Sequence, residues 1–160
     1  MATASSSAAA GTHAADRTLT ITRTLDAPRA LAFKVWSQPE HLARWWGPRG
    51  FTLPECKVDF RPGGTFFMLM RSPEGNDHRL RGTYREIDPP ARIACTWAWE
   101  DEDGKLGHET VLTVSFAEAG EKTRLTLHQA VFESLEARDS HNDGWTTCLE
   151  RLAAYVAQAA

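Results

Sequence analysis

The C-terminal segment constrains the fold of this chain most strongly, because its apolar residues follow a helical period over a long stretch. The apolar positions recur every three or four residues and share one stripe of a helix: Trp145, Cys148, Leu149, Leu152 and Val156. The outer face is expected to carry Glu150, Arg151 and Gln158. A helix that begins near Ser134 would run about 25 residues, or roughly 37 Å at about 1.5 Å per residue. We expect a strongly bent sheet to cover an apolar face of that length.

The middle of the chain alternates between apolar and polar residues, which is the pattern of half-buried strands. Residues 18–25 form a first such segment, and the clearest pair, residues 110–116 and 123–129, is joined by the polar turn 119–122. The segment RPGG at 61–64 supplies the proline and glycines of another tight turn. Consecutive strands with short polar connections predict an antiparallel meander.

Two short helices are expected between the first strand and the meander. Ser37 and Glu40 have the spacing of a capping box, and Pro39 stands at the first helical position. The order of one strand, two short helices, six strands and a long helix predicts an α+β fold. No internal repeat is visible, so residues 17–160 are expected to form one domain after a disordered tail at residues 1–16.

Composition excludes several classes of protein. The formal net charge of −3 and a pI near 6.1 give no basic footprint for nucleic acid, and no apolar run approaches the length of a membrane span. The cysteines at 56, 95 and 148 are odd in number and widely spaced, which argues against a disulfide framework or a zinc ribbon. The N-terminus lacks the pattern of a signal peptide. We therefore expect a cytoplasmic protein with no metal and no cofactor.

Five motifs in a fixed order carry a resemblance to a known family. They are DAPRALAFKVWSQPEHLARWWGP from Asp26, VDFRPGG from Val58, GTYREIDPPARIACTW from Gly82, TRLTL from Thr123 and ARDSHNDGWTTCLERLAAYV from Ala137. With them, the chain resembles the helix-grip proteins of the START and Bet v-like superfamily, also called SRPBCC, over residues 18–157. Within that superfamily it is similar to the AHSA-type branch, which resembles the C-terminal domain of the heat-shock protein 90 ATPase activator.

The resemblance implies a curved antiparallel sheet wrapped around the long C-terminal helix, with two short helices after the first strand and a cavity between these elements. Similar cavities occur in lipid carriers, polyketide aromatases and cyclases, and plant hormone receptors, and small apolar ligands are common to them. The expected partner is therefore a small hydrophobic or aromatic molecule. Both a monomer and a homodimer stay open.

Two criteria select the candidate ligand-binding residues: strand parity, meaning that alternate residues of a strand share one face, and the size of the side chain. Large aromatics are typical of ligand sites, and flexible methionines suit an adaptable wall, but the same strand faces also hold core residues. His108 and Gln129 are the best polar candidates, with the Tyr84 hydroxyl as a third. The full set is Trp45, Phe66, Met68, Tyr84, Trp97, Trp99, His108, Thr110, Gln129 and Trp145.

Catalytic residues are not evident, since the sequence has no nucleophile elbow, no zinc-protease helix motif and no phosphate loop. His141 lies four residues before Trp145, but a general base needs an orienting partner, so capping or packing is its expected role. The sequence favours a binding protein over an enzyme. Two alternatives stay open: an aromatase- or cyclase-like enzyme, which needs a hydrogen-bonded His or Tyr in the cavity, and a co-chaperone that stimulates a heat-shock protein 90 ATPase.

Overall fold

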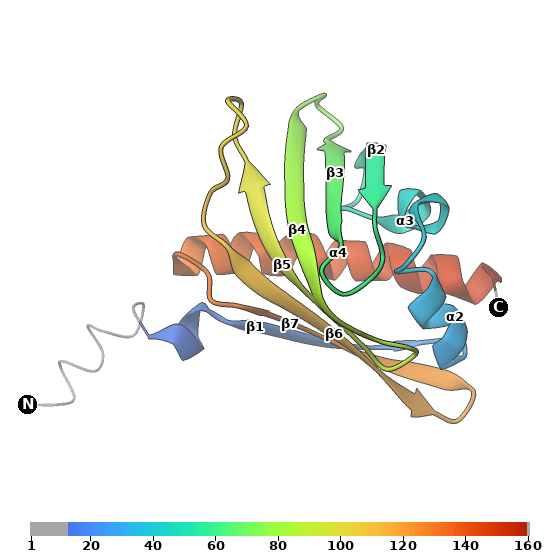
Figure 1. Ribbon diagram of the computed structural model, residues 1–160. Helices are drawn as coiled ribbons and strands as arrows, with labels where there is room; N and C mark the ends of the chain where they lie inside the picture. Colours follow the sequence, from blue (N-terminus) through green and yellow to red (C-terminus); the bar gives the residue numbers. More distant parts are fainter. Residues whose placement is uncertain (1–12, 160) are drawn as a thin grey trace, which may run out of the picture.

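A seven-stranded antiparallel sheet curves around one long helix in the computed structural model, which describes residues 13–159 (Figure 1). The strands are β1 (Leu19–Leu25), β2 (Thr52–Val58), β3 (Thr65–Arg71), β4 (Asp77–Asp88), β5 (Arg92–Glu100), β6 (Thr110–Ala119) and β7 (Lys122–Ala130). The helices are the 3-10 helix η2 (Ala14–Arg17) and the α-helices α2 (Arg29–Lys34), α3 (Pro39–Trp45) and α4 (Leu135–Ala159). The strand order is β1-β7-β6-β5-β4-β3-β2. The predicted helix-grip fold is confirmed.

Helix α4 lies along the inner side of the bent sheet (Figure 1). Its 25 residues follow Ser134, whose hydroxyl accepts a hydrogen bond from the Ala137 N–H at 3.0 Å and so caps the helix. The buried residues of α4 are those of the predicted apolar stripe: Trp145, Cys148, Leu149, Leu152 and Val156. The start, the length and the buried face of this helix agree with the sequence prediction.

Register shifts in the strand pairing help the sheet to bend. The pairing of β4 with β5 shifts between Tyr84 and Glu86, and such shifts kink a strand and increase its local twist. Gly82 on β4 lies opposite Phe66 on β3, and a Cβ added at Gly82 would lie 2.3 Å from the Phe66 ring. The glycine therefore lets an aromatic ring lie directly on the strand beside it.

Helices α2 and α3 lie beside the C-terminal half of α4 (Figure 1). The Nδ1 atom of His41 on α3 lies 2.7 Å from the Tyr155 hydroxyl on α4. The Thr123 hydroxyl on β7 donates to the carbonyl of Ala27, just before α2, at 2.8 Å. The first contact holds α3 against the long helix, and the second holds the start of α2 against β7.

The predicted capping box does not form. The N-cap residue of α3 is Gln38, which makes no side-chain cap bond, and the Ser37 hydroxyl donates to the Lys34 carbonyl at 2.7 Å instead. Helices α2 and α3 are so close in sequence that Ser37 belongs to the last turn after α2. Pro39 does stand at the start of α3, as expected.

The predicted tail falls largely outside the described residues, which begin at residue 13. Its last residues form η2 together with Arg17. The Arg17 carbonyl accepts a hydrogen bond from the Phe132 N–H at 2.9 Å, and Arg138 donates to the Asp16 carbonyl. These residues are therefore held against the rest of the domain, because the backbone carbonyls of Asp16 and Arg17 are bonded to residues near the start of α4.

Candidate ligand-binding cavity

Tryptophans from distant parts of the chain meet in one aromatic cluster. Trp36 stacks against Trp145, with ring centroids 6.1 Å apart and an interplanar angle of 24°. The Trp97 ring centroid lies 5.4 Å from that of Trp145 and 6.0 Å from that of Trp46. Trp97 and Trp99 form a T-shaped pair, with an interplanar angle of 90° and centroids 5.7 Å apart. Aromatic pairs at such distances and angles are favourable. The cluster joins the chain around α3 to β5 and α4.

A cavity of about 350 Å³ lies beside this cluster. Its walls come from residues 46–51 after α3, from β3, β4 and β5, and from the N-terminal half of α4. The large apolar side chains that line it are Trp46, Phe51, Met70, Trp97, Trp99 and Trp145. The polar side chains are His78, Ser140 and His141. Within the described chain, no Lys, Arg, Asp or Glu lines the cavity, which is therefore suited to an uncharged ligand.

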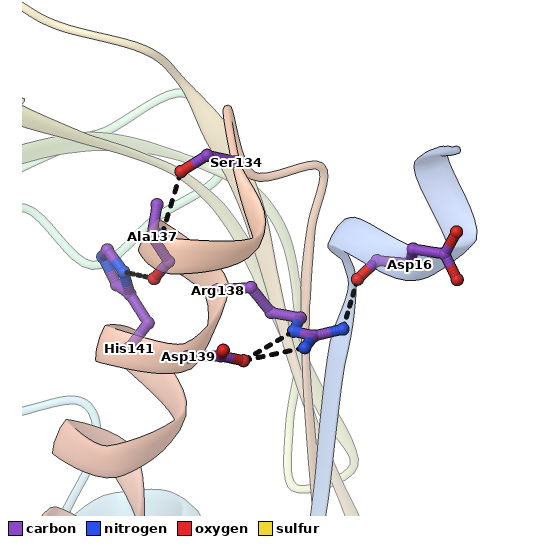
Figure 2. A network of polar contacts seen from close by, with 6 residues as sticks. All are labelled: Asp16, Ser134, Ala137, Arg138, Asp139 and His141. Atoms are coloured by element: carbon purple, nitrogen blue, oxygen red, sulfur yellow. Dashed lines mark hydrogen bonds and ion pairs between the residues drawn. The ribbon is translucent and has the colours of Figure 1, made fainter. Parts of the chain in front are cut away.

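His141 is held in one tautomer at the cavity wall. Trp99 donates its indole N–H to His141 Nε2 at 3.0 Å, and His141 Nδ1 lies 2.8 Å from the Ala137 carbonyl oxygen (Figure 2). Nε2 must accept and Nδ1–H must donate, which describes a neutral ring. Burial lowers the pKa of His141, and it outweighs the Ala137 carbonyl and Glu133, which act in the opposite direction. Because Trp99 already uses the Nε2 lone pair, His141 is not placed as a general base.

Arg138 fixes the first turns of α4, the part of the helix that carries His141. Figure 2 shows the Arg138 side chain extending toward η2 and the His141 side chain extending away from it. Arg138 reaches the carbonyl of Asp16 and also donates to Asp139 Oδ1 at 2.8 Å. This end of α4 is therefore tied to η2 by Arg138, while His141 contributes to the cavity wall.

Arg151 fixes the segment that forms the opposite wall. Its Nη1 lies 3.0 Å from the carbonyl oxygens of Trp46 and Gly47, 3.1 Å from that of Pro48 and 3.3 Å from that of Phe51. A cation is favourable at carbonyls that follow the end of a helix, because they lack helical partners. The prediction that Arg151 points outward is wrong. Its long side chain is half-buried and extends over the chain segment after α3.

Gln129 and Thr110 continue a chain of hydrogen bonds that begins at the indole N–H of Trp145. Trp145 Nε1 donates to Gln129 Oε1 at 2.8 Å, and Gln129 Nε2 donates to Thr110 Oγ1 at 2.9 Å. Gln129 is 0% exposed, so these bonds satisfy groups that water cannot reach. Neither residue lines the cavity; both orient the Trp145 ring that does.

A second, much smaller space lies deeper in the core, and we call it the inner hollow. Its volume is about 20 Å³, and Trp46 and Trp97 line both spaces. The candidates Phe66, Met68 and Tyr84 line the inner hollow and not the larger cavity. Burial raises the pKa of the Tyr84 hydroxyl well above its usual value, so this phenol stays protonated.

The structure separates the remaining candidates. Trp97, Trp99 and Trp145 line the larger cavity. Trp45 is fully buried and donates to the Val35 carbonyl at 3.1 Å, so it belongs to the core. The expectation that His108 lies inside the cavity is not met: this residue is exposed in the loop after β5, and its Nε2 lies 2.6 Å from the Val131 carbonyl oxygen.

Sequence reasoning missed Trp46, which is absent from the candidate ligand-binding residues although it lines both spaces. The signal was present in the pair Trp45-Trp46, because adjacent residues at the end of a helix point to different sides. Trp45 turns into the core, and Trp46 turns to the cavity and the inner hollow. His141 was expected to cap or pack, and its contacts with Trp99 and Ala137 are of that kind.

The cavity offers no activated nucleophile among the residues described. Burial raises the pKa of Cys148 to about 12, so its sulfur stays a thiol and not the reactive thiolate. Across residues 13–159, no group of three or more His, Cys, Asp and Glu side chains could hold a metal ion. No helix in that range is long and apolar enough to cross a membrane.

Comparison with known proteins identifies the family. Residues 26–157 match the family described as Activator of Hsp90 ATPase homolog 1-like protein. The chain belongs to this family. The match includes the two short helices, the sheet from β2 onward and nearly all of α4. A search among curated proteins finds no match.

Solved structures of bacterial proteins share the fold of this activator-like chain. The AHSA1 protein of Silicibacter pomeroyi is 29% identical with a TM-score of 0.83, and the match covers 89% of this chain and 99% of that one. A protein from Chromobacterium violaceum is 29% identical with a TM-score of 0.78, over 88% and 97% of the two chains. A Nitrosomonas europaea protein is 25% identical with a TM-score of 0.77, over 91% and 97%. The activator-like domain thus accounts for nearly the whole of each chain.

Proposed function

We propose that this activator-like protein binds a small hydrophobic or aromatic molecule in the larger cavity. The observation that carries the proposal is a space of about 350 Å³ walled by Trp46, Trp97, Trp99 and Trp145. Sites for small molecules typically occupy about 300–1,000 Å³ and combine apolar walls with a few polar groups. Indole rings in several walls favour a planar or ring-containing ligand.

The walls are held in place by bonds that a ligand does not need to supply. Trp145 is fixed by Gln129, Trp99 by His141, and the segment that carries Trp46 by Arg151. A site whose side chains are already ordered loses less conformational freedom on binding. This preorganisation supports a binding role for the cavity over a role as loosely filled core.

A thermal-shift screen tests the proposal, with a panel of fatty acids, flavonoids and polyketide-like aromatic compounds. A ligand at about 100 times its Kd should stabilise the native state by about 2.7 kcal/mol. The substitution Ser140→Trp places a large ring at a residue that lines the cavity, and it should abolish the shift. Asn142→Trp, at an exposed position two residues further along α4 and outside the cavity lining, is the matched control and should keep it. If no compound stabilises the wild-type protein, or if both variants respond alike, the proposal fails.

The aromatase- or cyclase-like alternative gains no support from the cavity. It requires a polar group that is free to accept or donate a proton at the bound substrate. The Nε2 atom of His141 is engaged by Trp99, and Tyr84 borders the inner hollow alone. His78, the other histidine of the lining, is exposed and contacts the rings of Phe51 and Trp99, which do not orient it as a base. We therefore propose binding without a chemical step.

The family match favours a second candidate, the stimulation of a heat-shock protein 90 ATPase. Residues 26–157 match a family whose description contains that activity. The test is a steady-state ATPase assay of purified heat-shock protein 90 with and without this protein. A rise in the ATPase rate that saturates with added protein would support the candidate, and an unchanged rate would remove it.

A further inference from the structure

The larger cavity meets solvent at polar side chains. Of the described residues that line it, only His78 and Ser140 are exposed. His78 lies near the start of β4, and Ser140 lies in the second turn of α4. Trp99 connects the two places, because its ring centroid is 6.3 Å from that of His78 and its N–H is bonded to His141, the neighbour of Ser140. The two exposed residues therefore border one opening, and we call them the rim.

Burial increases from the rim inward on the elements that form the walls. On β4, His78 is exposed, and Leu80, the next residue on the same face, is 0% exposed. On α4, Ser140 is exposed, and Cys148, about two turns further along, is 3% exposed. Trp97, which also lines the cavity, is buried. The cavity thus has a polar rim and an apolar interior.

The polar groups of the rim are free to bind a ligand. Within residues 13–159, neither the ring nitrogens of His78 nor the Ser140 hydroxyl forms a hydrogen bond with the protein. His78 has only ring contacts, with Phe51 and Trp99. His141 differs, because both of its ring nitrogens are engaged. A ligand in the cavity therefore finds its hydrogen-bonding side chains at the rim.

The chemistry of the rim selects the polar group of the ligand. A neutral imidazole has one donor and one acceptor nitrogen, and a serine hydroxyl both donates and accepts. A hydroxyl group on the ligand complements this pair, since it can donate to one side chain and accept from the other. Across the part of the chain that is described, the lining has no Lys or Arg to pair with an anion. An uncharged hydroxyl therefore fits the rim better than a carboxylate does.

We propose that the ligand is an uncharged, ring-containing alcohol or phenol that enters the cavity ring first and keeps its hydroxyl group at the rim, between His78 and Ser140. The inference rests on the proposed binding function and specifies the class and the orientation of the ligand. The apolar interior holds the ring system. The hydroxyl stays at the opening, where it avoids the cost of burying a polar group without a partner.

A matched pair of probes tests the inference: 2-naphthol and naphthalene share one bicyclic ring system, and only 2-naphthol has a hydroxyl group. Their Kd values are measured with the full-length protein by equilibrium dialysis. A net hydrogen bond between neutral groups changes Kd by about fivefold. We expect 2-naphthol to bind about fivefold more tightly than naphthalene. Naphthalene binding at least as tightly as 2-naphthol would overturn the inference.

Variants at the rim locate the hydroxyl. Ser140→Ala removes one partner, and His78→Phe removes the other while it keeps a flat ring beside Phe51 and Trp99. At least one of them should bring the two Kd values together. Thr146→Val, on the exposed side of α4, and His128→Phe, exposed on β7, are the matched controls outside the cavity lining and should keep the preference. An unchanged preference in both rim variants would contradict the proposal.

An NMR measurement on the wild-type protein tests the orientation without any variant. Ser140 and Cys148 lie about 12 Å apart along α4, at about 1.5 Å per residue. The 2-naphthol protons that flank the hydroxyl should show nuclear Overhauser effects to Ser140, and those at the far end of the rings to Cys148. The reverse pattern would overturn the inference and leave the proposed binding function intact. If neither probe binds and the wider panel also fails, the binding function and this inference fall together.

Discussion

The indole N–H of Trp99 on β5 is bonded to the Nε2 atom of His141 on α4 at 3.0 Å. This contact joins the sheet to the long helix at the cavity wall. It occupies the lone pair that a proton would take, while the other ring nitrogen is turned to the Ala137 carbonyl. Protonation of His141 would place two N–H groups against each other, so the cavity wall and the charge of His141 are coupled.

Stability should decrease in mild acid for this reason. Burial lowers the pKa of His141 below its usual value, which is about 6.5 in an unfolded chain. As the pH falls below about 6.5, the unfolded state takes up the proton first, and stability is lost from there down through the lower folded pKa. Above about 6.5 the contribution is fully retained. Urea unfolding at about pH 7.5 and about pH 5.5 measures the loss.

Two variants isolate the contribution of this histidine. His141→Gln retains an acceptor for Trp99 without a titrating ring, so it should lose less stability in acid than the wild type. His128→Gln changes an exposed histidine on β7 and should behave like the wild type. Identical pH dependence in all three proteins would show that His141 does not cause the loss.

Arg151→Met should destabilise the fold by about 2 kcal/mol, because hydrogen bonds to a charged group contribute about 1.5–3 kcal/mol. The loss should be accompanied by weaker binding of any cavity ligand, since the carbonyls that Arg151 holds belong to the segment from Trp46 to Phe51. Urea unfolding and a titration with the same ligand provide the two readouts. Arg49→Met is the control: its ion pair with Glu150 is exposed, with 76% and 42% of the side chains accessible, and its removal should change little.

Gln129→Met should cost about 1–3 kcal/mol, because it leaves the indole N–H of Trp145 buried and unpaired. Thr110 loses its partner in the same variant. The near-ultraviolet circular dichroism of the tryptophans should change, since Trp145 is no longer held. Gln158→Met, at an exposed position near the end of α4, is the control. An equal stability of the two variants would show that the hydrogen bonds of Gln129 do not stabilise the fold.

Gly144→Ala should raise stability and reduce binding. Glycine inside a helix is less favourable than alanine by about 1 kcal/mol, and the new Cβ would lie 3.5 Å from Pro48 Cγ, an ordinary contact. The same methyl group occupies space in the cavity that Gly144 lines. The midpoint of thermal unfolding should therefore rise, while the ligand affinity measured by titration should fall. Asn142→Ala, on the exposed face of α4, should leave ligand affinity unchanged; a drop in stability for Gly144→Ala would refute the steric argument.

Local patterns were sufficient for the elements but not for the site. The helical period from Trp145 to Val156 predicted both the buried stripe and the length of α4, because periodicity follows directly from backbone geometry. Strand parity, in contrast, shows only which side chains share a face. It could not separate Trp99, at the larger cavity, from Phe66, at the inner hollow, because alternation along a strand does not show which space a side chain borders.

Long side chains and loops limited the prediction in a different way. Arg151 reaches carbonyls about a hundred residues away in sequence, a contact that no helical period encodes. His108 follows β5 in a loop, where strand parity has no meaning, and it bonds to Val131 outside the cavity. The side chains of Trp45 and Trp46 point to different places because the chain leaves α3 at Trp46, and the sequence does not give the direction in which it leaves.

The sequence by itself determined the order of the elements, the antiparallel meander, the buried face of the C-terminal helix and the resemblance to the activator-like family, because each of these depends on local periodicity or on motifs. Only the tertiary structure decided which tryptophans line the cavity and which indole N–H groups find a partner. A hydrogen bond such as that from Trp145 to Gln129, or its absence at Trp46 and Trp97, depends on atoms brought together by the bend of the sheet around α4. The tryptophan-rich segments thus identify the fold, and the tertiary structure decides which of their N–H groups are paired.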